Sequence, residues 1–179
     1  MKLHLGCGTN ILKGYHNIDC TFRQEAESLV SKRGGCGDDD DSRYIIADAI
    51  MLKDYACDSV DEILCYHLFE HLPRPNAYCP NAITALGIWF SLLKSGGRLI
   101  MEMPNFEQVV KEYVDGNLRR KDNIFGLNRF PGDTHQWGYG PVDIEKMLRY
   151  SGFVDIVVSE GTDYHVKFEP CMRVEARKP

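Results

Sequence analysis

The chain has 179 residues, of which 44% are hydrophobic and 26% are charged, a composition typical of one globular domain and not of a disordered or fibrous chain. Its formal net charge is −5, and its one local basic cluster, at residues 119–121, falls short of the basic stripe of nucleic-acid-binding proteins. We therefore expect a single domain over residues 1–179, and we expect neither nucleic acid nor a membrane as a partner.

Location and redox state follow from simple patterns. No apolar run approaches the ~18 residues that a membrane-spanning helix needs, and the residues after Met1 lack a signal-peptide pattern, so we expect a cytoplasmic protein. The seven cysteines contain no C-x-x-C pair, which argues against a disulfide framework or a zinc knuckle. The oligomeric state is left open.

Apolar periodicity and turn residues predict the following elements in chain order. The first are strands at 2–5, 15–19, 44–47 and 60–66, with a helix at 22–32 and a solvated acidic loop at 37–42 between the second and third strands. One or two helical turns at 67–72, an amphipathic helix at 81–94, a strand at 98–103, helices at 106–115 and 141–150, and strands at 154–159 and 172–176 complete the chain.

The helix at 81–94 and the segment at 117–140 show two further sequence patterns. In the helix at 81–94 the apolar residues that share one face are Ile83, Leu86, Trp89, Phe90 and Leu93. Ser95-Gly96-Gly97 is expected to cap that helix, and the segment at 117–140 is expected to be irregular. Because strands alternate with helices, we predict an α/β fold: a mainly parallel sheet with helices on both faces.

Three features lie at the predicted carboxyl ends of strands, where open α/β sheets bind their ligands. Gly6-Cys7-Gly8 follows the first strand, and glycine allows the backbone to approach a ligand closely. Asp19 ends the second strand, and its carboxylate suits two ribose hydroxyls. Asp48 and Ala49 end the third strand, where a carboxylate and a backbone N–H can contact adenine. A dinucleotide fingerprint is disfavoured, because its third glycine position is Ile11.

This series resembles the class I S-adenosylmethionine-dependent methyltransferases, and in particular the compact methyltransferase type 11 subtype. The resemblance rests on LGCGTNILKGYHNID at 5–19, ADA at 47–49, DSVDEILCYHLFEHL at 58–72, LKSGGRLIMEMPN at 93–105, HQWGYGPVDIEKMLRYSGF at 135–153 and RVEARKP at 173–179. It implies a Rossmann-like seven-stranded sheet of order 3-2-1-4-5-7-6 with the last strand antiparallel.

The resemblance also implies a cofactor, S-adenosyl-L-methionine, with S-adenosyl-L-homocysteine as product. Its methionine part would contact Gly6, Cys7 and Gly8. Its ribose would contact Asp19, with Cys20 beside it, and its adenine would lie between Asp48 and Ala49. Tyr66 and His67 would line the methyl-transfer site, and Glu70 would orient a neighbour or contact the amino group of the cofactor.

One motif suggests a different chemistry. His67-Leu68-Phe69-Glu70-His71 matches the H-x-x-E-H pattern of a zinc-protease class, in which two histidines on one helical face bind the metal. Glu102, Glu107 and Glu112 are the acidic residues available downstream as a third ligand. However, Pro73 stops the helix early, and the family resemblance places this segment at the exit of the fourth strand. We therefore expect no metal.

Methyl transfer to a hydroxyl needs a base. The possible bases are His67, His71 and His135, of which His67 and His135 are favoured. The aromatic side chains of the 117–140 segment are expected to wall the acceptor pocket or to cover the sheet as core. A small molecule or a glycan is the expected acceptor. The alternatives are methylation of protein or nucleic acid, for which no recognition domain is present, and a non-catalytic adenosylmethionine-binding protein.

Overall fold

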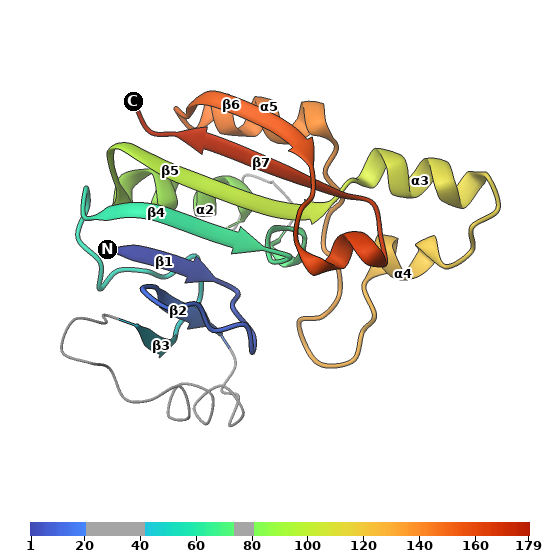
Figure 1. The fold of residues 1–179 in the computed structure, drawn as a ribbon, viewed down its shortest axis with the longest axis horizontal. Coiled ribbons are helices and arrows are strands. Elements are labelled where there is room, and N and C mark those ends of the chain that lie inside the picture. Colours follow the sequence, from blue (N-terminus) through green and yellow to red (C-terminus); the bar gives the residue numbers. More distant parts are fainter. Residues whose placement is uncertain (21–41, 74–80) are drawn as a thin grey trace.

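The computed structural model describes residues 1–20, 42–73 and 81–179, and its strands form one seven-stranded sheet (Figure 1). The strands are β1 Lys2–Leu5, β2 His16–Asp19, β3 Arg43–Ile46, β4 Val60–Tyr66, β5 Leu93–Pro104, β6 Val154–Glu160 and β7 Cys171–Arg177. Their order is β3-β2-β1-β4-β5-β7-β6. β7 runs antiparallel to β5 and β6, whereas β3, β2, β1, β4 and β5 pair in parallel. The predicted order and the antiparallel last strand are confirmed.

The helices of the described residues are η1 Phe69–His71, α2 Ala82–Leu92, α3 Phe106–Val114, α4 Arg120–Phe125, α5 Pro141–Tyr150 and η2 Tyr164–Lys167. Each of them is too short or too polar to cross a bilayer. The helix expected at 22–32 and the acidic loop at 37–42 lie outside the described residues. Within 117–140 the structure forms α4, so this segment is less irregular than predicted.

The hydrophobic core lies on one side of the sheet. Alternate residues of the strands point to it, namely Leu3, Leu5, Ile18, Ile63, Cys65, Leu99, Met101, Met103, Met172, Val174 and Ala176. They pack in one cluster with Leu86 and Trp89 of α2 and with Ile144 and Leu148 of α5, and both helices lie behind the sheet in Figure 1. The period of two in these strands is the pattern of a sheet with one apolar face.

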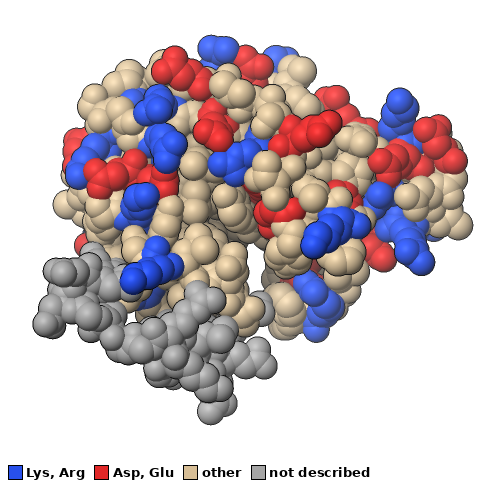
Figure 2. All heavy atoms as spheres, viewed as in Figure 1, with Lys and Arg blue, Asp and Glu red and all other residues tan. Residues whose placement is uncertain are grey.

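The opposite side chains of the same strands are largely charged. Figure 2 shows acidic and basic side chains interspersed over the face toward the viewer. Buried Glu62 of β4 accepts hydrogen bonds from Tyr15 and Arg98, and buried Glu102 of β5 pairs with Arg173 of β7 at 2.8 Å. On this side of the sheet, ion pairs therefore join neighbouring strands, whereas on the other side apolar side chains pack in the core.

Two local predictions were wrong at the junction of α2 and β5: the end and buried face of the helix, and the first residue of the strand. The helix ends at Leu92, and its buried side chains are those of Ala82, Ala85, Leu86, Trp89 and Leu92, so Ile83 and Phe90 are only partly buried. β5 begins at Leu93 instead of residue 98. Gly96 and Gly97 form an irregular stretch of that strand, in which Gly96 N donates to Lys178 O and Lys178 N donates to Gly97 O. Because Lys178 is about 80 residues away in the sequence, local sequence patterns could not predict this pairing.

Substitution of Glu102 by glutamine is expected to lower the free energy of unfolding by about 1–3 kcal/mol at neutral pH. The Glu102 carboxylate accepts hydrogen bonds from Thr162 N (2.8 Å), Asp163 N (2.9 Å) and Arg173 (2.8 Å), and an amide nitrogen in its place leaves donors without an acceptor. Urea denaturation measures the change. Glu175→Gln is the matched control, because Glu175 also pairs with Arg173 but is 44% exposed; equal losses in the two variants would contradict the prediction.

The Glu102 effect should also depend on pH. Burial raises the pKa of Glu102, but the hydrogen bonds from Thr162, Asp163 and Arg173 outweigh burial and hold that pKa below 4.5. A carboxyl group with a lowered folded-state pKa stabilises the protein above its unfolded-state pKa, and this contribution is lost as the folded form protonates. The difference between wild type and Glu102→Gln should therefore narrow as the pH falls below about 4.5.

Candidate functional site

The glycine turn after β1 has the backbone conformation that glycine permits. Gly6 and Gly8 have φ values of 65° and 53°, in the left-handed region that disfavours other residues. A Cβ atom on Gly6 would lie 2.8 Å from Cβ of Leu68, whereas no atom of residues 1–20, 42–73 and 81–179 lies within 4 Å of a Cβ built on Gly8. Gly6 thus permits close packing against the exit of β4, and the position of Gly8 leaves open space at the turn.

Asp19 at the end of β2 is joined directly to that turn. Its Oδ2 accepts a hydrogen bond from Gly8 N at 2.8 Å, and Cys7 N donates to Ile18 O at 3.1 Å. The carboxylate can accept further hydrogen bonds. Cys20 follows Asp19 as an exposed residue. The predicted glycine turn and the predicted acid are therefore parts of one structure.

Asp48 and Ala49 form a turn directly after β3. Asp48 Oδ1 accepts from Ile50 N at 3.0 Å, and Ala49 O accepts from the buried Trp89 Nε1 at 2.8 Å. Trp89 belongs to α2, so the core helix fixes the backbone of this turn. Because β1, β2 and β3 pair in parallel and in sequence, the three predicted features end at the same edge of the sheet.

Tyr66 and His67 stand at the exit of β4, on the side where η2, α3 and α4 lie (Figure 1). His67 has a φ of 48°, and its backbone N donates to Glu102 O at 2.8 Å. This left-handed residue ends the strand two residues before η1 begins. The Tyr66 hydroxyl lies 3.3 Å from Arg173 of β7.

The imidazole of His67 lies among three carboxylates. Its Nδ1 is 3.3 Å from Glu70 and 3.5 Å from Glu169, and its Nε2 is 3.6 Å from Asp163. Burial lowers the pKa of His67, but contacts with Asp163, Cys171 and Glu70 outweigh it and raise that pKa to about 12. His67 is therefore a buried imidazolium near neutral pH and has no lone pair with which to accept a proton.

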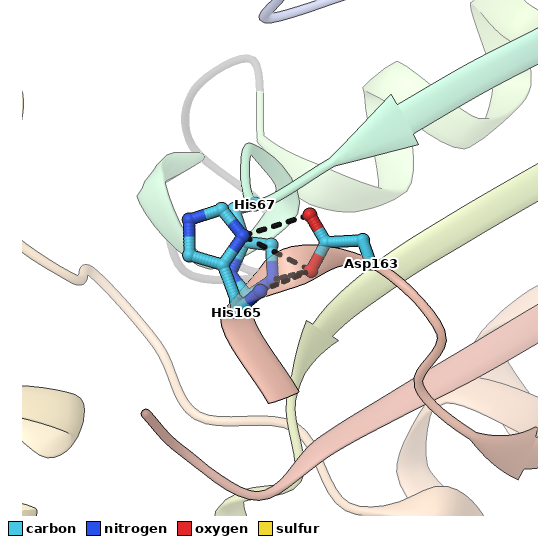
Figure 3. A group of neighbouring side chains, drawn as sticks. All are labelled: His67, Asp163 and His165. Atoms are coloured by element: carbon cyan, nitrogen blue, oxygen red, sulfur yellow. Dashed lines mark hydrogen bonds and ion pairs between the residues drawn. The ribbon is translucent and has the colours of Figure 1, made fainter. Parts of the chain in front are cut away.

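The β6–β7 connection supplies the other groups around His67. Figure 3 shows the rings of His67 and His165 beside the Asp163 carboxylate. The two ring centroids are 3.7 Å apart, and Asp163 accepts from His165 N at 2.8 Å. Burial raises the pKa of Asp163, but its contacts with His67 and His165 reverse this and hold that pKa well below its usual range. Burial raises the pKa of Glu169 to about 7.

His135 and His71 also lie close to Glu70. Their rings meet edge to face at 4.8 Å between centroids. His135 Nδ1 lies 2.8 Å from Asn123 O and His71 Nδ1 lies 3.2 Å from Thr134 O. A carbonyl oxygen only accepts, so the Nδ1 of each ring is the donor. Burial lowers the pKa of His135, against the opposing charge of Glu70.

The zinc-protease pattern does not form its expected geometry. Because η1 starts at Phe69 and His67 has a left-handed backbone, His67 and His71 do not share a helical face. Glu102, proposed by residue type as a third ligand, instead binds the start of the β6–β7 connection. The residue that joins Glu70 and His71 is His135.

No local sequence pattern indicates that Asp163, His165, Glu169 and Cys171 lie at this position. They surround His67 because β7 lies between β5 and β6 in the sheet, which brings the β6–β7 connection beside the exit of β4. The aromatic residues of 117–140 divide between two roles. Tyr139 is buried against Phe69, with ring centroids 4.8 Å apart, whereas Phe125, Phe130 and Trp137 are exposed. No disulfide joins the cysteines among the described residues.

Comparison with known proteins adds information on the fold. No family model and no curated protein matches the chain. A S-adenosylmethionine-dependent methyltransferase of Methanosarcina mazei is similar in structure, with 19% identity, a TM-score of 0.68 and coverage of 99% of this chain and 91% of that one. Magnesium protoporphyrin IX methyltransferase of Synechocystis PCC 6803, determined with bound S-adenosylhomocysteine, has 18% identity, a TM-score of 0.65 and coverage of 100% and 74%.

A third similar structure is 1,6-didemethyltoxoflavin-N1-methyltransferase of Burkholderia thailandensis, bound to 1,6-didemethyltoxoflavin and S-adenosylhomocysteine. It has 14% identity, a TM-score of 0.65 and coverage of 99% of this chain and 70% of that one. At identities this low, the structural similarity supports the fold alone. It is consistent with the strand order described above. The chain has the fold of the class I S-adenosylmethionine-dependent methyltransferases.

Proposed function

We propose that this chain is an S-adenosylmethionine-dependent methyltransferase that methylates a hydroxyl group of a small molecule or a glycan. The observation that carries the proposal is the joining of the glycine turn to Asp19 through the Gly8 N–Oδ2 hydrogen bond, at the sheet edge where Asp48 and Ala49 also lie. Similar structures with bound S-adenosylhomocysteine support the choice of cofactor.

Different residues at this edge would contact different parts of the cofactor. Gly6, Cys7 and Gly8 would contact its methionine part, with the open space at Gly8 leaving room for it. Asp19, with Cys20 beside it, would hold the ribose through its carboxylate. Asp48 and Ala49 would hold the adenine, in a turn that Trp89 fixes. Tyr66 and His67 would line the reacting end of the site.

Bound S-adenosylmethionine supplies a methyl group on a positively charged sulfonium, ready for displacement. The chain would align the acceptor oxygen with that methyl group, a positioning effect worth roughly 7–11 kcal/mol in favourable cases. The acceptor must also lose a proton. Of the two histidine candidates, His135 suits this role better, because its Nδ1 is oriented by Asn123 O and its Nε2 keeps a lone pair. His67 would keep the site ordered as a fixed cation, with Glu70 orienting it.

Calorimetric titration with S-adenosylmethionine, S-adenosylhomocysteine and NAD tests the cofactor assignment. We expect both adenosyl compounds to bind with dissociation constants of order 1–100 μM and NAD not to bind, because the third glycine of a dinucleotide site is missing. An acceptor screen that starts with sugars and small phenols then follows release of S-adenosylhomocysteine. Binding of NAD alone, or of none of the three compounds, would overturn the proposal.

A further inference from the structure

Three potential metal ligands meet beside the exit of β4. Glu70 and His71 belong to η1, and His135 comes from the segment between α4 and α5. One ligand atom of each lies within 4.8 Å of the other two. Two imidazoles and one carboxylate form a set that divalent transition metals bind in many enzymes, with positions left open for other ligands.

The Glu70 carboxylate is a second, independent observation. Glu70 is 3% exposed, and neither of its carboxylate oxygens has a hydrogen-bond partner among the described residues. His67 Nδ1 lies 3.3 Å from Oε1 as an ion-pair contact, without the geometry of a hydrogen bond. A buried carboxylate without hydrogen bonds is costly, and a bound cation would satisfy it.

The two histidine rings are oriented as metal ligands usually are. In metal sites, the ring nitrogen that does not bind the ion commonly donates to a backbone carbonyl. His71 Nδ1 faces Thr134 O at 3.2 Å, and His135 Nδ1 faces Asn123 O at 2.8 Å. The Nε2 atom of each ring is thereby left for a metal ion.

Backbone contacts hold the distant ligand in place. Gln136 N donates to Glu70 O at 2.7 Å, and His135 N donates to Phe125 O at 3.1 Å. Gly126 allows this close approach, since a Cβ there would lie 2.3 Å from Asp133 O. The position of His135 beside η1 therefore depends on backbone hydrogen bonds as well as on its side chain.

Two neighbouring groups of the described residues also contain metal-binding side chains, namely His67, Asp163 and His165, and His67, Glu169 and Cys171. Both depend on His67, which already lies between carboxylates as their counter-ion. The Asp163 carboxylate moreover accepts from the His165 backbone N. The carboxylates of Asp163 and Glu169 already accept hydrogen bonds, whereas among the described residues the Glu70 carboxylate has its ion-pair contact with His67 but no hydrogen bond.

We infer that Glu70, His71 and His135 bind one divalent transition-metal ion of the Zn²⁺ or Fe²⁺ type. Nitrogen ligands disfavour Mg²⁺ and Ca²⁺, which select oxygen. This site goes beyond the proposed function, and metal binding is measured independently of it. Ligation would use the His135 lone pair that the proposed function assigns to proton removal, so the ion and the proton compete for one atom.

The test uses Zn²⁺ and Co²⁺ as probes on the full chain. Protein stripped with a chelator is loaded with one equivalent of Zn²⁺, passed through a desalting column and analysed for metal content. We expect retention of about one Zn²⁺ per chain. The variants His71→Ala, His135→Ala and Glu70→Gln should each weaken Zn²⁺ binding by more than the roughly 10–100-fold that loss of an outer-shell partner causes. His165→Ala is the matched control and should bind as wild type does.

Each other outcome overturns the site. Retention of Zn²⁺ by both His71→Ala and His135→Ala, or its loss in His165→Ala, would place the ion at His67 and its neighbours. A thiolate-to-cobalt charge-transfer band in the Co²⁺ protein would place it at Cys171. No retention by wild type would exclude the site. Urea denaturation checks that the histidine variants are folded. Because this check does not use S-adenosylmethionine, failure of the metal site is distinguishable from failure of the proposed cofactor, and the two histidine variants decide the test even if Glu70→Gln does not fold.

Discussion

Substitution of Asp19 by alanine is expected to weaken S-adenosylmethionine binding by about 100-fold or more. The variant loses the carboxylate acceptor for the ribose and also the hydrogen bond that Gly8 N donates to Oδ2 at 2.8 Å. Because the Gly8 N bond exists with and without the cofactor, the loss of affinity comes from the two hydrogen bonds that the ribose hydroxyls would donate to the carboxylate. Hydrogen bonds to charged groups contribute about 1.5–3 kcal/mol each, and two of them correspond to a factor of at least 100. Calorimetric titration of the wild type and the variant measures this change directly.

Asp48→Ala is the informative comparison for Asp19→Ala. Within the described part of the chain, Asp48 Oδ1 accepts one hydrogen bond, from the nearby Ile50 N, and its proposed contact is with the adenine amino group. We expect a loss of about tenfold for this variant, corresponding to one hydrogen bond. If Asp19→Ala bound S-adenosylmethionine as well as wild type does, the ribose assignment would be wrong, whatever the effect of Asp48→Ala.

Replacement of His67 by alanine is expected to lower the free energy of unfolding by about 3–5 kcal/mol, the usual cost of removing one partner from a buried ion pair. The side chains of His67, Glu70, Asp163 and Glu169 are all at most 12% exposed. Without the imidazolium, the three acids would lie close together in a buried site with no cation between them. Urea denaturation at neutral pH measures the loss.

His165→Ala serves as the control for the His67 prediction. His165 is 27% exposed and contacts Asp163 alone among these acids, so its removal should cost no more than about 1 kcal/mol. The double variant His67→Ala/Glu70→Gln should recover part of the loss, because it removes one of the uncompensated charges. Equal destabilisation by His67→Ala and His165→Ala would falsify the assignment of His67 as the central cation.

The meeting of the glycine turn, Asp19 and Asp48 at one sheet edge could be predicted because its determinants are local, whereas their contacts with a cofactor stay a prediction. Strand, glycine turn and acid follow one another within residues 2–19, and parallel pairing then places Asp19 and Asp48 at one edge. The absence of a helix between β1 and β2 also follows from the short spacing between Gly8 and Asp19. The apolar face of the strands can likewise be predicted, because apolar residues recur at every second position.

The environment of His67 could not be predicted in the same way. Its neighbours Asp163, Glu169 and Cys171 lie about 100 residues away in sequence, as the separation of 104 between Cys171 and His67 shows. Only the insertion of β7 between β5 and β6 brings them together. The H-x-x-E-H motif misled for a related reason: the pattern assumes helical spacing, whereas His67 precedes η1 and has a left-handed backbone, so it does not share a helical face with His71.

The place of β7 has a consequence for biosynthesis. β7 is the last of the seven strands to leave the ribosome, yet it lies between β5 and β6 and pairs with both. Until it emerges, β5 presents a long row of unpaired backbone groups, and β6 has no neighbour in the sheet. Such exposed strand edges promote aggregation of nascent chains. Premature termination before residue 171 should therefore yield aggregates and not a smaller folded protein.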